Sequence, residues 1–316
     1  MKINPIIFIL IILIELFCNL NKCHVNAQSL NTDKPKISFT FDDGSVDDMP
    51  GYKLEEWNQM LLDNLQKFEL SSILFSMGKN KESERGKYIL SSWNDVGHKI
   101  ANHTYSHSNF NSKKITLEDF ESELIKNDSI INIYSNYYKY FRFPYLKEGN
   151  TKEKIEGFRS FMDANGYRNG HVTIDASDWY VNGRLLKRLQ SDTSADVSAF
   201  RDFYIKHLYS RALFYDSLAY QLTGRKISHV ILLHHNLAAA LFLDDLIQFF
   251  KDNGWEIMNA EEAYSDDIYN SFPDNIPAGE SLIWALAKQS GKFESVLRYP
   301  AEDGEYEKDE MDKLGL

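Results

Sequence analysis

Two adjacent carboxylates, Asp42 and Asp43, stand at the end of a predicted strand. The preceding residues, Ile37 to Phe41, are mostly apolar or β-branched, which predicts a buried strand, and Gly44 allows a sharp turn after it. Because neighbouring side chains on an extended backbone point in opposite directions, we expect the two carboxylates to do different work. One can hold a metal ion while the other takes a proton from water. Alone, an Asp-Asp-Gly run is also typical of an ordinary turn.

Two histidines four residues apart, His103 and His107, suggest a metal site. On a helical turn this spacing places both rings on one face, where they can bind the same ion. The residues between them include no carboxylate, so a general base must come from elsewhere in the chain. Asp43 as third ligand would complete a set of two histidines and one carboxylate. His98 lies nearby, but its spacing from His103 does not suit the same helical face.

An arginine and a tyrosine follow the fourth predicted strand, at Arg142 and Tyr145. A guanidinium at a strand end can hold a carboxylate through two hydrogen bonds, which lowers the carboxylate pKa and orients the group. Pro144 stiffens the turn that presents the backbone N–H of Tyr145. The alternative is a surface arginine and a packing tyrosine.

A carboxylate pair and a histidine pair close two later predicted strands. The first contains Asp175 and Asp178, followed by the large aromatic ring of Trp179. The second is His234 and His235 at the tip of an apolar run. A histidine in this place with a carboxylate available is a general-acid candidate. Strand alternation permits only one of the two histidines to face the site, and His235 remains an alternative to His234.

Strand-like and helix-like segments alternate along the chain, which predicts an α/β fold with a parallel sheet. In such folds the chemistry gathers at the carboxyl ends of the strands, where every motif above falls. The predicted strands are Lys36–Phe41, Ser72–Ser76, Lys99–Asn102, Tyr140–Phe143, Val172–Ile174, His229–Leu233 and Trp255–Met258. The predicted helices are Leu54–Phe68, Leu117–Tyr137, Glu153–Asn165 and Ala238–Asp252, with a further helical stretch from Asp192 to Arg225.

The first residues of the chain have the pattern of a secretory signal peptide. Lys2 precedes an apolar run from Ile6 to Phe17, and small residues lead up to Ala27, which predicts cleavage after Ala27 and a secreted or periplasmic protein. An uncleaved membrane anchor is the alternative. Both cysteines, Cys18 and Cys23, fall in this segment, so the processed chain would have no disulfide and no thiolate nucleophile.

Composition limits the partners. With 316 residues, 43% of them hydrophobic, the chain can form one large domain with a core. Its net charge of −11 without a basic stripe argues against nucleic acid and anionic membrane surfaces. After Ala263 two prolines interrupt the chain, an apolar helix is predicted at Glu280–Lys288, and the acidic run Glu302–Asp312 is expected to be solvated.

Five motifs, taken together and in order, strongly resemble the polysaccharide deacetylase family, also called the NodB homology domain or carbohydrate esterase family 4. They are Thr40–Gly44, His103–His107, Arg142–Tyr145, Asp175–Trp179 and the Leu-x-x-His block that starts at Leu232. The resemblance implies an incomplete (β/α)7 barrel and divides the chain into a signal peptide (1–27), a linker (28–35), the deacetylase domain (36–263) and a C-terminal extension with an acidic tail (264–316).

The resemblance also implies roles. One divalent ion, expected to be zinc although cobalt, nickel or iron would accept the same ligands, is held by Asp43, His103 and His107. Asp42 is the base that activates water and Arg142 orients it. The Tyr145 N–H stabilises the oxyanion, and His234 protonates the leaving group. Asp178 raises the pKa of that imidazole and holds its tautomer. Trp179 lines the acetyl pocket or the sugar groove, and Tyr145 also binds the substrate.

The function implied is the removal of acetyl groups from N-acetylated sugars of a polysaccharide such as chitin or peptidoglycan. An esterase acting on O-acetyl groups, as in acetylated xylan, uses the same chemistry and is the first alternative. A carbohydrate-binding protein that has lost turnover on the same fold is the second. The loop after Gly44 carries Asp47 and Asp48 and is expected to reshape the groove. Lys147, Glu148 and Asn150 are expected to be solvated loop residues, and the alternative is that they border the substrate cleft.

Overall fold

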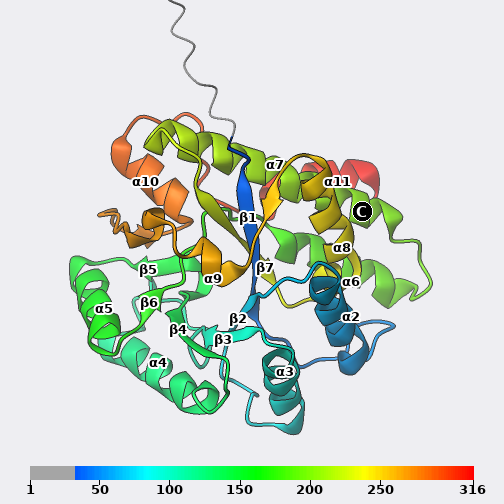
Figure 1. Ribbon diagram of the computed structural model, residues 1–316, viewed down its shortest axis with the longest axis horizontal. Coiled ribbons are helices and arrows are strands. Elements are labelled where there is room, and N and C mark those ends of the chain that lie inside the picture. Colours follow the sequence, from blue (N-terminus) through cyan, green and yellow to red (C-terminus); the bar gives the residue numbers. More distant parts are fainter. Residues whose placement is uncertain (1–32) are drawn as a thin grey trace, which may run out of the picture. The chain divides into compact units, whose positions relative to one another are not determined.

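The computed structural model describes residues 33–316, so the predicted signal peptide lies outside the described residues. Residues from Lys34 to Leu316 form one compact unit, and no helix in it is both long and apolar enough to cross a membrane. Its centre is a parallel sheet with the strand order β6-β4-β3-β2-β1-β7, and β8 pairs with β1 (Figure 1). The α/β fold with a parallel half-barrel sheet is therefore confirmed. The strands are β1 (Lys36–Asp43), β2 (Ile73–Ser76), β3 (Lys99–Asn102), β4 (Tyr137–Phe141), β6 (Arg168–Asn169), β7 (Ser228–His234) and β8 (Glu256–Ile257).

Helices surround this sheet in Figure 1 and connect its parallel strands. Helix α2 shows why these segments are helical: Trp57, Leu61 and Leu65 recur at four-residue spacing and are fully buried. Side chains fix where several helices begin, as at α8, where Asn236 accepts a hydrogen bond from the N–H of Ala239. The helices are α2 (Leu54–Lys67), α3 (Glu84–Asp95), α4 (Leu117–Ile131), α5 (Lys152–Ala164), α6 (Asp178–Ser191), α7 (Ser198–Thr223), α8 (Leu237–Asp252), α9 (Ala260–Ala263), α10 (Leu282–Ser290) and α11 (Glu305–Leu314).

The sheet register brings the predicted motifs to one edge. Asp42 on β1 is paired with His234 on β7, and its neighbour Asp43 is paired with Ser76 on β2. Ser76 is in turn level with Asn102 on β3, which directly precedes His103. Because parallel strands end at the same edge, motifs far apart in sequence meet there.

One predicted strand is wrong. Val172–Ile174 makes only a single parallel bridge, between Ile174 and Ile231. Instead of continuing a ladder, Thr173 turns its side chain onto β7, where its hydroxyl donates to the carbonyl oxygen of Val230. The outer strand beside β4 is the two-residue β6.

The C-terminal extension is more tightly packed than expected. Its short strand β9 (Ala278–Gly279) pairs antiparallel with β5 (Lys147–Gly149). The acidic run is not simply solvated: the carboxylates of Glu302 and Glu307 are buried, with side chains 1% and 5% exposed. Each contacts an arginine, which offsets the cost of removing a charge from water.

Candidate metal centre and active site

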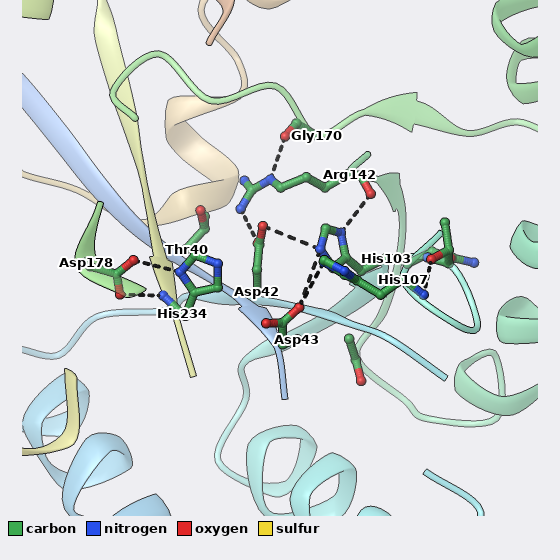
Figure 2. A network of polar contacts seen from close by, with 12 residues as sticks. Thr40, Asp42, Asp43, His103, His107, Arg142, Gly170, Asp178 and His234 are labelled. Carbon is green, nitrogen blue, oxygen red and sulfur yellow. Dashed lines mark hydrogen bonds and ion pairs between the residues drawn. The ribbon is translucent and has the colours of Figure 1, made fainter. Parts of the chain in front are cut away.

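Three side chains at the edge of the sheet could hold a metal ion. Ligand atoms of Asp43, His103 and His107 all lie within 4.8 Å of one another. Asp43 Oδ1 is 3.7 Å from His103 Nε2 and 3.3 Å from His107 Nε2 (Figure 2). These separations suit atoms that share one cation, since each would sit about 2.0–2.2 Å from zinc.

The chemistry of the three groups fits a cation. Asp43 Oδ1 is buried without a hydrogen-bond donor among the described residues. His103 donates from Nδ1 to the carbonyl oxygen of Arg142 at 2.8 Å, which leaves the lone pair of Nε2 free. Burial lowers the pKa of His103 and of His107 to about 4, so both rings are neutral at neutral pH, as metal ligands must be.

The histidines do not lie on a helical turn, so that expectation was wrong. They belong to an irregular loop after β3 in which Thr104 and His107 both have positive φ, at 63° and 59°. Asn102 stabilises this loop by accepting hydrogen bonds from the N–H of Thr104 and from the Asn127 side chain. The left-handed residues, rather than helical periodicity, turn both rings toward Asp43.

Asp42 and Asp43 face the same cavity. Asp43 has a φ of 76°, and this left-handed conformation ends the alternation expected of a strand. As a result His103 Nε2 lies 3.7 Å from Asp42 Oδ2 as well as from Asp43 Oδ1. The turn is supported from behind by the buried Lys81, whose Nζ donates to the carbonyl oxygen of Gly44 at 2.6 Å. Sequence reasoning missed this lysine.

Arg142 holds Asp42 with one hydrogen bond and not two. Its Nη1 lies 2.5 Å from Asp42 Oδ1, and Nε donates to the carbonyl oxygen of Gly170 (Figure 2). Nη2 donates to the Tyr264 hydroxyl. The guanidinium is therefore fixed at three points. The expected lowering of the carboxylate pKa is not found: burial raises the pKa of Asp42 and outweighs the attraction of Arg142. A carboxylate with a raised pKa is a better proton acceptor.

His234 and Asp178 form a close pair on the other side of Asp42. Asp178 Oδ1 lies 2.6 Å from His234 Nδ1, and Asp178 itself is fully buried. Burial disfavours the imidazolium, but the attraction of Asp178 outweighs it and raises the pKa of His234 to about 10. His235 points elsewhere: its Nε2 lies 2.9 Å from Asn58 Oδ1 and its ring contacts Trp57. The structure thus places His234, and not His235, in the cavity.

One cavity of about 450 Å³ is lined by Asp42, Asp43, His103, His107 and His234. Tyr145 and Trp179 stand at its edge with exposed fractions of 58% and 46%, available to a ligand. Lys147 lines the cavity, paired with Glu280, so the alternative that it borders the cleft holds rather than the solvated loop; Glu148 is buried against His171. The cavity is also lined by Asp175, Leu146, Leu232, Pro300, Glu302 and Asp303.

Residues 29–158 match the family described as Polysaccharide deacetylase. The matched range contains the aspartate pair, both histidines of the metal group, Arg142 and Tyr145. Over this range the chain is similar to the polysaccharide deacetylase family. The resemblance seen in the sequence is confirmed. Asp178, Trp179 and His234 lie beyond the matched range; in the folded chain Trp179 and His234 line the same cavity, and Asp178 contacts His234 from behind.

A curated relative is the peptidoglycan-N-acetylglucosamine deacetylase of Bacillus cereus, 28% identical over 148 residues. The alignment covers 46% of this chain and 47% of the relative, so the chain spans about half the length of the curated relative it matches.

Solved structures share the fold. A CE4 family pseudoenzyme from Bacillus anthracis is 16% identical, with a TM-score of 0.51 over 73% of this chain and 66% of its own. A mutant of that pseudoenzyme with restored enzymatic activity is 18% identical, with a TM-score of 0.51 over 73% and 68%. A peptidoglycan N-acetylglucosamine deacetylase bound to a substituted benzamide is 20% identical, with a TM-score of 0.50 over 74% and 89%.

Proposed function

We propose that the chain is a metal-dependent hydrolase that removes acetyl groups from the N-acetylated sugars of a polysaccharide of the chitin or peptidoglycan type. One observation carries the proposal: a single cavity is lined by the Asp43, His103 and His107 group, by Asp42 and by His234, and the ring of His234 is held by the buried Asp178 behind it. The Bacillus cereus relative is a peptidoglycan-N-acetylglucosamine deacetylase, which supports the choice of an N-acetyl group.

The base in this proposal is Asp42. A divalent ion held by Asp43 and the two histidines would acidify water and polarise the acetyl carbonyl. Asp42 lies beside that group, with Oδ2 3.7 Å from His103 Nε2, and accepts the proton as the water oxygen bonds to the carbonyl carbon. Arg142 keeps the carboxylate directed at this position. The backbone N–H of Tyr145, at the cavity edge, is the proposed donor to the developing oxyanion.

The acid is His234. Breaking the bond between carbon and nitrogen releases an amine, which must gain a proton as acetate departs. With a pKa raised to about 10 by Asp178, the ring of His234 carries that proton at neutral pH. Its Nδ1 is directed at Asp178, which leaves Nε2 as the donor to the leaving nitrogen.

Two further parts belong to the proposal. Two imidazoles and one carboxylate are a common ligand set for zinc with positions left open, and we propose zinc as the ion. The sequence of residues 1–27, with its basic start and apolar run, supports a protein that acts outside the cytoplasm, where such polymers occur.

The proposal is tested by measuring acetate released from three substrates: acetylated chitooligosaccharides, peptidoglycan and acetylated xylan. We expect release from at least one of the first two and little from xylan. Release from xylan alone would favour an O-acetyl esterase. No release from any of them by the zinc-loaded protein, with binding retained, would favour the silent carbohydrate-binding alternative.

A further inference from the structure

Ser177 lies directly before Asp178, the residue that holds the proposed acid His234, and its side chain does not cap helix α6. The hydroxyl donates instead to Glu307 Oε2 at 2.7 Å and lies 3.3 Å from His207 Nε2. A serine at this position usually caps its helix, but here the hydroxyl is hydrogen-bonded to a different segment of the chain.

That other segment is the C-terminal helix. Glu307 belongs to α11, and its carboxylate is buried, with Arg298 Nη1 3.4 Å from Oε1. A hydrogen bond from a hydroxyl to a carboxylate is shorter and stronger than one between two neutral groups. The Ser177 side chain is therefore held by Glu307, which lies 130 residues further along the chain.

The segment 298–316 contacts α6, the helix that begins with Asp178, near both ends of α11. Gly304 packs so closely on Tyr180 that a methyl group at residue 304 would come within 2.2 Å of the ring. At the far end of α11, Arg184 contacts both Asp312 and the carbonyl oxygen of Leu316. Pro300, Glu302 and Asp303 of the same segment line the active-site cavity.

We propose that Glu307 is a positioning residue: through Ser177 it holds Asp178, and thereby the ring of His234, in the orientation that protonates the leaving nitrogen. The inference rests on the proposed deacetylase function and assigns part of that site to the C-terminal extension. Asp178 and Ser177 are adjacent in the chain, so a displaced Ser177 displaces the carboxylate that grips His234 at 2.6 Å.

A nucleophilic reading of Ser177, His207 and Glu307 does not fit. Ser177 is fully buried and does not line the cavity. Its hydroxyl donates directly to the carboxylate, whereas a serine nucleophile is bonded to the histidine and the carboxylate orients that histidine. His207 Nδ1 lies 3.9 Å from Glu307 Oε1, too far for a hydrogen bond. The cluster therefore supports structure near Asp178 and does no chemistry of its own.

The test compares four variants: Glu307→Ala, Glu307→Gln, Ser177→Ala and the control Glu310→Ala. Glu310 is on the same helix, is exposed, and makes no ion pair or side-chain hydrogen bond among the described residues. Each zinc-loaded variant is assayed on an acetylated chitooligosaccharide and on 4-nitrophenyl acetate. The aryl ester has a leaving group that departs without protonation, so its hydrolysis does not need the acid.

If Glu307 acts as proposed, Glu307→Ala and Ser177→Ala lower kcat on the sugar amide about 10- to 100-fold and leave aryl ester hydrolysis within about twofold. Glu307→Gln retains an acceptor oxygen for Ser177 and recovers most of the amide activity. Glu310→Ala changes neither rate. Equal losses on both substrates, or an unchanged ratio of the two rates in Glu307→Ala, would overturn the inference.

A second readout needs no turnover. The ring of His234 is titrated by NMR in the wild-type protein and in each variant. The carboxylates that face this ring, Asp42, Asp43 and Asp178, are present in all of them. We expect the His234 pKa to fall toward 6.5 in Glu307→Ala and to stay close to the wild-type value in Glu307→Gln. An unchanged His234 pKa in Glu307→Ala contradicts the positioning role of Glu307. A wild-type protein that is inactive on every acetylated glycan contradicts the proposed function alone.

Discussion

Asp178 makes two hydrogen bonds to His234. Its Oδ1 lies 2.6 Å from the ring Nδ1, and its Oδ2 accepts a hydrogen bond from the backbone N–H at 2.9 Å (Figure 2). A third hydrogen bond, from Asn236 Nδ2 at 3.0 Å, completes the environment of the carboxylate. The pair is therefore rigid, and the proton of the imidazolium is bound more tightly in the folded chain than in the unfolded one.

This pair makes stability depend on pH. The folded-state pKa of His234 is about 10, above its ordinary 6.5, so the contribution is fully present below pH 6.5 and is lost as pH rises toward 10. We expect the free energy of unfolding of the metal-free protein to fall over this window, by an upper limit of about 5 kcal/mol.

Urea denaturation across the same pH window measures the effect. In Asp178→Asn, the raised pKa and its slope should be largely gone, so the stability difference between the two proteins shrinks as pH rises. Parallel curves for wild type and variant would show that the carboxylate does not hold the His234 proton.

Metal binding should depend on His103 far more than on its neighbour His98. Replacing His103 by Ala removes one of three ligands, and we expect zinc affinity to fall by at least about 100-fold. His98 is the matched control, because it is also a buried histidine but contacts Ser72 and Trp93 rather than the metal group. Metal analysis after dialysis should find about one zinc per chain in His98→Gln and little in His103→Ala. Equal zinc contents would remove His103 from the ligand set.

The seating of the C-terminal segment can be tested with two glycines. Gly304→Ala would place a methyl group 2.2 Å from Tyr180, and we expect it to destabilise the protein by about 1–3 kcal/mol. Gly183, inside α6, has nothing within 4 Å of an added methyl group, so Gly183→Ala should stabilise by about 0.5–1 kcal/mol. Thermal unfolding of the two variants gives the comparison. A Gly304→Ala protein as stable as wild type would mean that the segment is not seated on Tyr180.

The site could be predicted where residue type and strand ends decide it. Asp42, Asp43, His103, Arg142 and His234 all follow or end strands whose apolar runs are plain in the sequence, and parallel strands bring their carboxyl ends together.

The sequence could not predict how those side chains turn. The opposite orientation expected of Asp42 and Asp43 fails because Asp43 adopts a positive φ, a conformation that an aspartate seldom takes without tertiary support. The prediction that His103 and His107 lie on a helical turn is wrong for the same reason, because Thr104 and His107 have left-handed backbone conformations. These conformations depend on partners from elsewhere, such as Asn127 on α4.

The role of the C-terminal extension was also hidden from the sequence. Acidic runs are usually solvated, and only Arg298 among the partners of Glu302 and Glu307 lies near them in the sequence. The other partners, Arg211 and Ser177, lie far upstream in the chain, so only the folded chain reveals that the two carboxylates are buried.

In the proposed mechanism, Asp42 activates water beside a cation held by Asp43, His103 and His107. The most direct test is the rate of acetate release from an acetylated chitooligosaccharide by Asp42→Asn, with the zinc content measured in the same sample. The exposed loop residue Asp47 provides the control Asp47→Asn. We predict that Asp42→Asn keeps its zinc and loses acetate release by about 100-fold or more, while Asp47→Asn retains both. Near-normal acetate release by zinc-loaded Asp42→Asn would contradict the account.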